Sequence, residues 1–146
     1  MNEVALTFWD VADALSRAVP LSPRSVEQIL GVDLAETSRT PGLVCWTAKG
    51  PDLADEVRLD AVELRAGASN PESGFLLVAV SGRCVSVEEV RGRYPEVRIT
   101  GHPRGRSLEE KTVYSTDFDW GRLSFGFKES NRRCLASLTF HPKSIE

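Results

Sequence analysis

The chain repeats one order of elements at a nearly constant spacing. Residues 25–31 (SVEQILG) have a counterpart 61 positions later in residues 86–92 (SVEEVRG). The apolar segment 74–80 (GFLLVAV) likewise lies 60 positions before residues 134–140 (CLASLTF). A helix and a strand that keep the same spacing are harder to produce by chance than either alone. The recurrence therefore predicts an α+β fold made of two similar halves.

Length and composition allow the two halves to share one core. With 146 residues and 41% apolar content, the chain can bury about two-thirds of the surface that it exposes when unfolded. We predict a single domain over residues 1–146, with an N-terminal helix at about residues 8–19 and the halves at roughly residues 22–81 and 83–141. Each half is expected to be a helix followed by a strand meander. The two meanders are predicted to form an antiparallel sheet with the helices packed on one face.

Capping residues mark the ends of the predicted helices. Ser22 followed by Pro23 is typical of an N-cap and a first helical position, and Gly31 supplies the C-terminal stop. In the second half, Ser86 and Glu89 have the spacing of a capping box, in which hydroxyl and carboxylate each accept a hydrogen bond from the other residue's backbone.

Alternation of apolar and polar residues follows each helix and indicates strands. In the first half we predict strands at residues 43–48, 56–66 and 75–80, with a bulge in the second of them. Residues 75–80 are apolar on both faces, so this strand is expected to be central. The second half is predicted to be a meander with strands at residues 97–100, 112–118, 122–128 and 134–140. On the third of these, one predicted face carries Leu123, Phe125 and Phe127, and the other carries Arg122, Ser124, Gly126 and Lys128.

The cysteines and the absence of export signals indicate the compartment. Cys45, Cys84 and Cys134 are odd in number, widely spaced and set in apolar stretches, which favours buried thiols over a disulfide framework or a metal site. No apolar run of about 18 residues and no signal-peptide pattern is present. We therefore predict a cytoplasmic protein with no membrane association.

The chain offers few groups for catalysis. Its two histidines, His102 and His141, do not lie in a recognisable catalytic frame, although His102 could act as a base near Cys84 or Ser107. No metal-ligand spacing and no phosphate-binding glycine loop occurs. We predict a protein that is not an enzyme and needs no cofactor, and we keep a small enzyme using His102 as an alternative.

Charge is unevenly distributed along the chain. Residues 1–73 carry a net charge of −6 and residues 74–146 a net charge of +3. A nucleic-acid or anionic-ligand module is the alternative that this basic part suggests, although the overall charge of −3 is unlike that of a dedicated nucleic-acid binder. The anion-binding residues would be Arg91, Arg93, Arg98, Arg104 and Arg106.

Large aromatic and acidic side chains gather on or beside the predicted strand ends. Aromatic side chains can anchor a protein interface, and carboxylates can meet basic groups on a partner. Trp120, in a predicted turn, is expected to be the most exposed of them. The candidate partner-binding residues are Trp46, Tyr114, Asp117, Phe118, Asp119 and Trp120.

The order of helix and short strands, then the same order again, resembles the tandem architecture of β-lactamase-inhibitor-protein-like proteins. The resemblance rests on the SVEEV helix start at residues 86–90 and the strand WGRLSFGF at residues 120–127. It is topological and covers roughly residues 22–141. It implies that the helices of both halves pack on one face of a shared antiparallel sheet and that the open, concave face grips another protein.

This chain differs from the secreted inhibitors, which are exported and carry a disulfide in each half. The resemblance therefore implies a cytoplasmic relative, such as a bacterial immunity protein that neutralises a cognate toxin by covering its active site. An acidic immunity protein suits a toxin that attacks nucleic acids or nucleotides, because such a toxin has a basic cleft.

Overall fold

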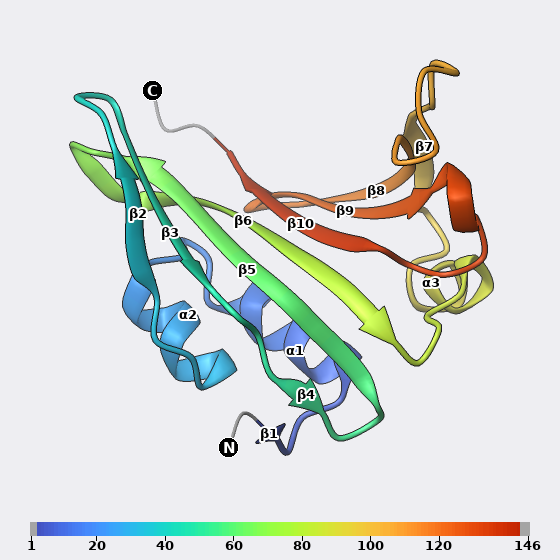
Figure 1. Cartoon of the computed structure of the whole chain (residues 1–146), viewed down its shortest axis with the longest axis horizontal. Helices are drawn as coiled ribbons and strands as arrows, with labels where there is room; N and C mark the ends of the chain where they lie inside the picture. The colour runs from blue at the N-terminus through green and yellow to red at the C-terminus, as the bar shows by residue number, and fades with distance from the viewer. Residues whose placement is uncertain (1–2, 144–146) are drawn as a thin grey trace.

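A computed structural model describes residues 3–143 and contains three α-helices and ten β-strands (Figure 1). The helices are α1 (Phe8–Arg17), α2 (Pro23–Leu30) and α3 (Val87–Arg93), and a short 3-10 helix spans Glu129–Asn131. The strands are β1 (Glu3–Val4), β2 (Ala35–Arg39), β3 (Leu43–Ala48), β4 (Asp52–Leu53), β5 (Val57–Gly67), β6 (Asn70–Gly82), β7 (Arg98–Gly101), β8 (Lys111–Phe118), β9 (Gly121–Lys128) and β10 (Ser137–Pro142). Within residues 3–143, no helix has both the length and the apolar character needed to cross a membrane.

All ten strands of the described residues belong to one sheet. Its longest path runs β1-β4-β5-β6-β10-β9-β8-β7, and β3 joins β5 and carries β2 on its outer edge. Every pairing is antiparallel except that of β1 with β4. The predicted α+β class with an antiparallel sheet is confirmed, and the predicted second meander is the run β7, β8, β9 and β10.

The two runs of strands meet where β6 pairs with β10. In this pairing Val78 lies opposite Leu138, with Leu77 opposite Thr139 and Ala79 opposite Ser137. Strand β6 therefore has neighbours on both edges, as its apolar sequence predicts.

The two SVE segments, residues 25–27 and 86–88, do not occupy equivalent positions in their helices. Ser22 is the N-cap of α2 and Ser25 lies inside its first turn, whereas Ser86 is the N-cap of α3. Residues 61 positions apart thus occupy different helical positions. The reason is local, because Pro23 is favoured at the first helical position and starts α2 before Ser25.

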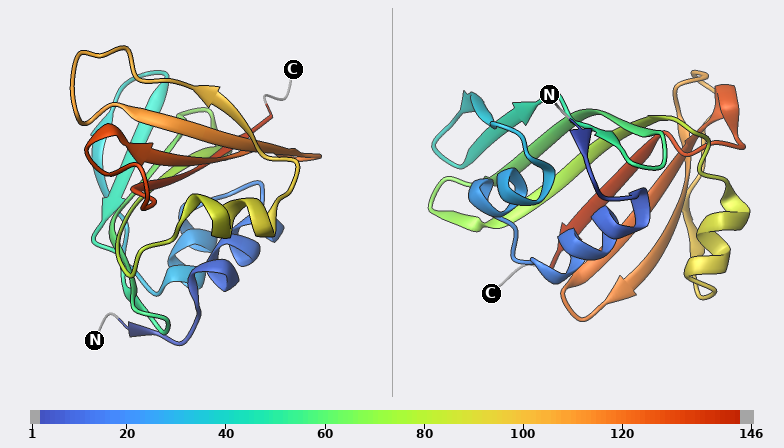
Figure 2. Two further views of the ribbon diagram at one scale, coloured as in Figure 1. Left: turned by 90° about the vertical axis from the view of Figure 1, so that its right-hand side faces the viewer. Right: turned by 90° about the horizontal axis from the view of Figure 1, so that it is seen from below.

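All three helices lie on one face of the sheet (Figure 2). One continuous core contains Phe8 and Leu15 of α1, Val26 of α2 and Val90 of α3, each fully or almost fully buried. The strands supply their inward residues to the same core, and the inward residues of β9 are Leu123, Phe125 and Phe127. The alternation predicted for β9 is therefore confirmed on its apolar side.

The helix caps follow the sequence except at α3. Gly31 ends α2 in the left-handed conformation, with φ at 66°. Ser86 accepts a hydrogen bond from the Glu89 backbone (3.1 Å), but the Glu89 side chain does not return to close the predicted capping box. It accepts a hydrogen bond from Trp9 Nε1 instead (2.7 Å) and pairs with Arg83. The Glu89 carboxylate, which the local spacing predicts to cap α3, is thus bound by residues from other parts of the chain.

The cysteine prediction is wrong for two of the three residues. Cys84 and Cys134 form a disulfide with a Cα–Cα distance of 4.9 Å, and Cys84 is exposed. Cys45 is a free thiol and is half-buried. Residues 50 positions apart could not be paired from spacing, because only the β6–β10 pairing brings the two segments beside each other.

Two other differences from the predicted strands concern the first half. The edge strand β2 was not predicted, because all five of its residues are exposed and it shows no apolar alternation. The segment between the predicted strands at residues 56–66 and 75–80 forms the end of the β5–β6 hairpin, because β5 extends to Gly67 and β6 begins at Asn70. The predicted bulge in β5 is confirmed by the register shift between Leu59 and Ala61.

The disulfide closes a loop that holds α3 and strands β7 to β9. A loop of this length corresponds to about 4 kcal/mol in the chain-entropy model, and measured losses are typically about 2–4 kcal/mol. We expect the double substitution Cys84→Ser, Cys134→Ser to lower the free energy of unfolding by about 2–4 kcal/mol in urea titrations. The single variant Cys45→Ser is the control, and equal stability of the double variant and the wild type would contradict the prediction.

Candidate functional site

The face of the sheet opposite the helices is not covered by any element of residues 3–143. Its outward side chains follow from strand alternation, since the neighbours of each core residue point the other way. On β9 these are Arg122, Ser124, Gly126 and Lys128, as the sequence predicts. We call this surface the open face.

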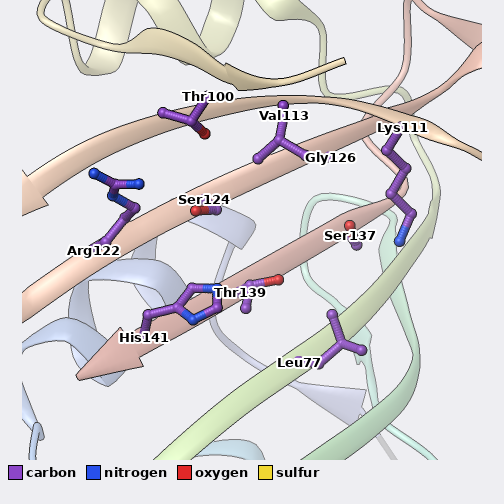
Figure 3. Close-up of a pocket in the computed structure, with 11 residues that line it drawn as sticks. Leu77, Thr100, Lys111, Val113, Arg122, Ser124, Gly126, Ser137, Thr139 and His141 are labelled. Atoms are coloured by element: carbon purple, nitrogen blue, oxygen red, sulfur yellow. The ribbon is translucent and has the colours of Figure 1, made fainter. Parts of the chain in front are cut away.

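The middle of the open face is hollowed because its side chains are small. A cavity of about 540 Å³ lies there between β6 and β7, over β10, β9 and β8 (Figure 3). Ser124, Gly126, Ser137 and Thr139 form its floor, and Leu77 and larger polar side chains form its margin. We call this cavity the hollow.

Hydroxyl groups form a connected chain beside the floor. The side-chain oxygens of Thr100 and Ser115 lie 2.7 Å apart, and those of Ser115 and Ser124 lie 2.8 Å apart. Ser115 is fully buried and Ser124 nearly so. These hydrogen bonds hold together the side chains of three adjacent strands. Each hydroxyl can donate as well as accept, so the direction of each hydrogen bond can reverse.

Lys111 enters the hollow across Gly126. A Cβ atom at position 126 would lie 2.8 Å from Lys111 Cδ and 2.4 Å from Ser137 Oγ. Only glycine therefore leaves room for the lysine stem at this point. Figure 3 shows the stem of Lys111 extending from β8 toward Ser137 on β10. Burial, and to a smaller extent Lys128, lowers the pKa of the Lys111 ammonium.

A second group of charges lies at the opposite end of the hollow. Asp117 accepts hydrogen bonds from Arg122 Nε (3.0 Å) and Arg98 Nη2 (2.8 Å). These two guanidinium groups, Arg122 first, hold the pKa of the Asp117 carboxyl below its usual value. His141 packs edge-on against Phe75, with ring centroids 4.5 Å apart. Burial and the nearby Arg122 lower the pKa of His141, which favours the neutral imidazole.

The predicted partner-binding residues do not form one surface. Phe118 and Trp120 stack on each other with ring centroids 5.4 Å apart, and Trp120 also stacks on Phe140. These two rings lie on the helix side of the sheet, beside Tyr94 of the α3 C-cap. Trp120 is half-buried, so its predicted exposure is wrong. The Trp120 ring lies against the core rather than in solvent because it can stack on the apolar rings of both Phe118 and Phe140.

The other four candidates are divided between the two faces. Trp46 and Tyr114 are partly buried against the core, and Tyr114 lies edge-on to Phe127. Asp117 belongs to the open face, where its charge is shared with two arginines. Asp119 is exposed in the turn between β8 and β9.

The five arginines of the alternative anion site also point to different partners. Arg91 lies over the Tyr114 ring, with its guanidinium carbon 5.4 Å from the centroid, and Arg93 pairs with Asp13. Arg98 pairs with Asp117. Arg104 and Arg106 are exposed, and their backbone amides donate to the Glu110 carboxylate. The structure therefore does not bring these guanidinium groups together.

The groups considered for a His102 enzyme are likewise not assembled. His102 is exposed in the connection between β7 and β8. The Cys84 sulfur is held in the disulfide and is not available as a nucleophile. Ser107 Oγ accepts a hydrogen bond from the Glu109 backbone (3.0 Å).

Sequence reasoning found part of the hollow and missed its lysine. The polar alternation on β9 indicated Arg122, Ser124 and Gly126, but it could not show which strands flank them. Lys111 stands at the first position of β8, just before the predicted strand. The signal for it is the glycine opposite its stem, which can be interpreted only once the register of β8 and β9 is known.

Comparison with protein-family models, with curated protein sequences and with solved structures finds no match to this chain. The site is therefore interpreted from its own chemistry.

Lys111 should cost the folded protein stability. Its pKa is lower in the folded state than the value of about 10.4 in an unfolded chain, so the unfolded state binds more protons between these two values. Stability from this residue therefore rises as the pH increases through that window. We expect Lys111→Met to be more stable than the wild type at pH 7, by less than about 1 kcal/mol because Lys111 is only partly buried.

Urea titrations of both proteins between pH 7 and pH 10 test this expectation. The advantage of Lys111→Met should shrink as the pH rises, whereas Lys49→Met, at an exposed lysine outside the hollow, should show no such trend. A Lys111→Met variant that is less stable than the wild type at pH 7 would contradict the assignment.

Proposed function

We propose that the chain is a non-enzymatic protein-binding domain, and specifically a bacterial immunity protein that neutralises a cognate toxin by binding it. The observation that carries the proposal is the open face, a hollowed sheet surface with all three helices of residues 3–143 packed on its other side. Because the helices pack against one face of the sheet and complete the hydrophobic core there, the opposite face is held in a fixed shape. Such a rigid surface binds a partner with little loss of conformational entropy.

We further propose that the two strand runs are related by an internal repeat. The register of β6 and β10 supports this, because Val78 and Leu138 are opposite each other and 60 positions apart. A shift by 60 converts the pair Leu77 and Thr139 into the pair Ser137 and Ala79, which is also present. A two-fold arrangement of this kind extends the open face across both runs and gives a partner a wide surface.

The packing of the aromatic candidates assigns them different roles in this proposal. Trp46 and Tyr114 stabilise the helix side, and Phe118 and Trp120 fix the β8–β9 turn. Asp117 and Asp119 stand at the margin of the open face, and Asp117 is neutralised by Arg98 and Arg122. We therefore propose the hollow as the centre of the binding surface, with the β8–β9 turn at its edge.

The cytoplasmic location is kept as a prediction, and the disulfide bears on it. Disulfides form and persist mainly in oxidising compartments. Rapid alkylation of thiols in intact cells that produce the protein, followed by mass spectrometry, measures the state of Cys84 and Cys134. Reduced thiols would support the cytoplasm, and a complete disulfide would favour export.

The binding proposal predicts a stoichiometric protein partner whose retention depends on the open face. Thr139, in the floor of the hollow, is the position to block. We expect Thr139→Arg to lower the affinity for the partner at least tenfold, because an arginine there would fill the hollow. Gln28→Arg, at an exposed position of α2 on the helix side, is the matched control and should bind like the wild type.

The measurement is affinity purification from the native lysate, followed by titration of the identified partner with both variants. As a toxin, the partner should arrest growth when it is expressed alone and be tolerated when it is expressed with this chain. Recovery of nucleic acid without a protein, or equal binding by both variants, would overturn the proposal. Circular dichroism of each variant verifies that it is folded.

A further inference from the structure

The residues that line the hollow carry cationic groups and no carboxylate. Lys111, Arg122 and His141 are the titratable side chains among them, and the remaining lining is hydroxyl, glycine and apolar. The sign of this charge is opposite to the net charge of the chain, which is −3. A cavity without acidic groups in an acidic protein selects against cations and favours an anionic group.

Lys111 is the cation whose charge is left for a ligand. Arg122 is paired with Asp117 at 3.0 Å, and the neighbouring Lys128 is paired with Glu109 at 2.7 Å. Among the ion pairs of residues 3–143, none includes Lys111. Glu109, which pairs with Lys128, attracts Lys111 only from beyond ion-pair distance. An ammonium group that is partly desolvated and has no carboxylate in contact gains more from an incoming anion than an exposed, paired lysine does.

The surroundings of Lys111 favour a carboxylate. Ser137 lies next to the lysine stem over Gly126 and can donate a hydrogen bond from its hydroxyl to an oxygen that Lys111 binds. Arg122 stands four residues from Gly126 along β9, at a distance of roughly 13 Å at the strand rise. Its charge is already shared with Asp117. The hollow thus offers about one positive charge, which matches a monoanion better than a phosphate dianion.

From these observations we propose that the hollow binds an aspartate or glutamate side chain of the protein partner, with Lys111 Nζ as its counter-ion and Ser137 Oγ as a hydrogen-bond donor. The proposal rests on the proposed protein-binding function and adds the chemistry of the partner. The cavity of about 540 Å³ opens to solvent on the open face, so it can receive a side chain from a protruding loop of a partner. An acid at this point is buried on binding, and the contact adds specificity as well as affinity.

A peptide titration tests this chemistry without knowledge of the partner. The probes are hexaglutamate, hexaglutamine and inorganic phosphate, each added to the isotope-labelled full chain at about 0.15 M salt, where exposed charges are largely screened. We expect hexaglutamate to shift the backbone amide signals of Lys111, Ser124, Ser137 and Thr139 in a saturable way. Hexaglutamine should leave them unchanged, and phosphate should bind at least tenfold more weakly than hexaglutamate.

Two lysine variants provide the matched comparison. Lys111→Met keeps the length of the stem and removes the charge, and it should weaken hexaglutamate binding at least fivefold. Lys128→Met removes the lysine directly opposite Lys111 in the β8–β9 register and should weaken it less than twofold. Lys111→Arg, which restores the charge, should recover most of the affinity.

Equal losses in Lys111→Met and Lys128→Met would overturn the proposal, since they would indicate diffuse attraction. Phosphate binding as tight as that of hexaglutamate would overturn the carboxylate assignment. Shifts confined to residues 102–107 would transfer anion binding to the exposed arginine connection. If Thr139→Arg weakens binding of the protein partner but Lys111→Met does not, this inference fails while the proposed binding function stands. If no protein partner is found, the proposed binding function itself fails.

Discussion

The pairing of β6 with β10 is the contact on which the rest of the structure depends. It joins the last strands of two runs that are separate in sequence, and it is antiparallel with Val78 opposite Leu138. Both side chains are buried in the core shared by the three helices. The same pairing sets Leu77 beside Thr139 on the open face, so the wall and the floor of the hollow come from different runs. The covalent bond between Cys84 and Cys134 then holds the chain together just beyond one end of this pairing.

The two faces of the sheet have opposite packing requirements, and the sequence of β9 meets both. Leu123, Phe125 and Phe127 fill the space beneath the helices, where loss of volume would leave a cavity. Ser124 and Gly126 on the other side are small, so the open face stays hollow. The buried hydroxyls of Ser115 and Ser124 are satisfied by each other and by Thr100. This avoids the cost of unpaired polar groups at these two positions and makes polar side chains compatible with a stable sheet.

Local signals predicted most elements, because helix caps and strand alternation act over a few residues. Gly31 and the alternation of residues 122–128 are of this kind. Features that depend on contacts between distant segments were not accessible. The Cys84–Cys134 disulfide required the β6–β10 pairing, and the half-buried position of Trp120 required Phe140 from another strand. Glu89 satisfied the spacing of a capping box but was taken by Trp9 and Arg83. Each of these contacts depends on which distant segments of the chain become neighbours in the fold, and local sequence patterns do not reveal this.

Lys111 shows that a residue of the hollow need not contribute to the stability of the fold. A methionine or leucine at this position would cover Gly126 without desolvating a charge, so stability alone does not favour a lysine there. Arg98, Arg122 and Lys128 on the same face are each in an ion pair, the two arginines with the shared carboxylate of Asp117 and the lysine with Glu109. An unpaired cation among paired ones is therefore better explained by a group that arrives from outside the chain than by folding. The glycine that admits it and the serine beside it belong to two further strands, so the position of this charge is fixed by the sheet as a whole.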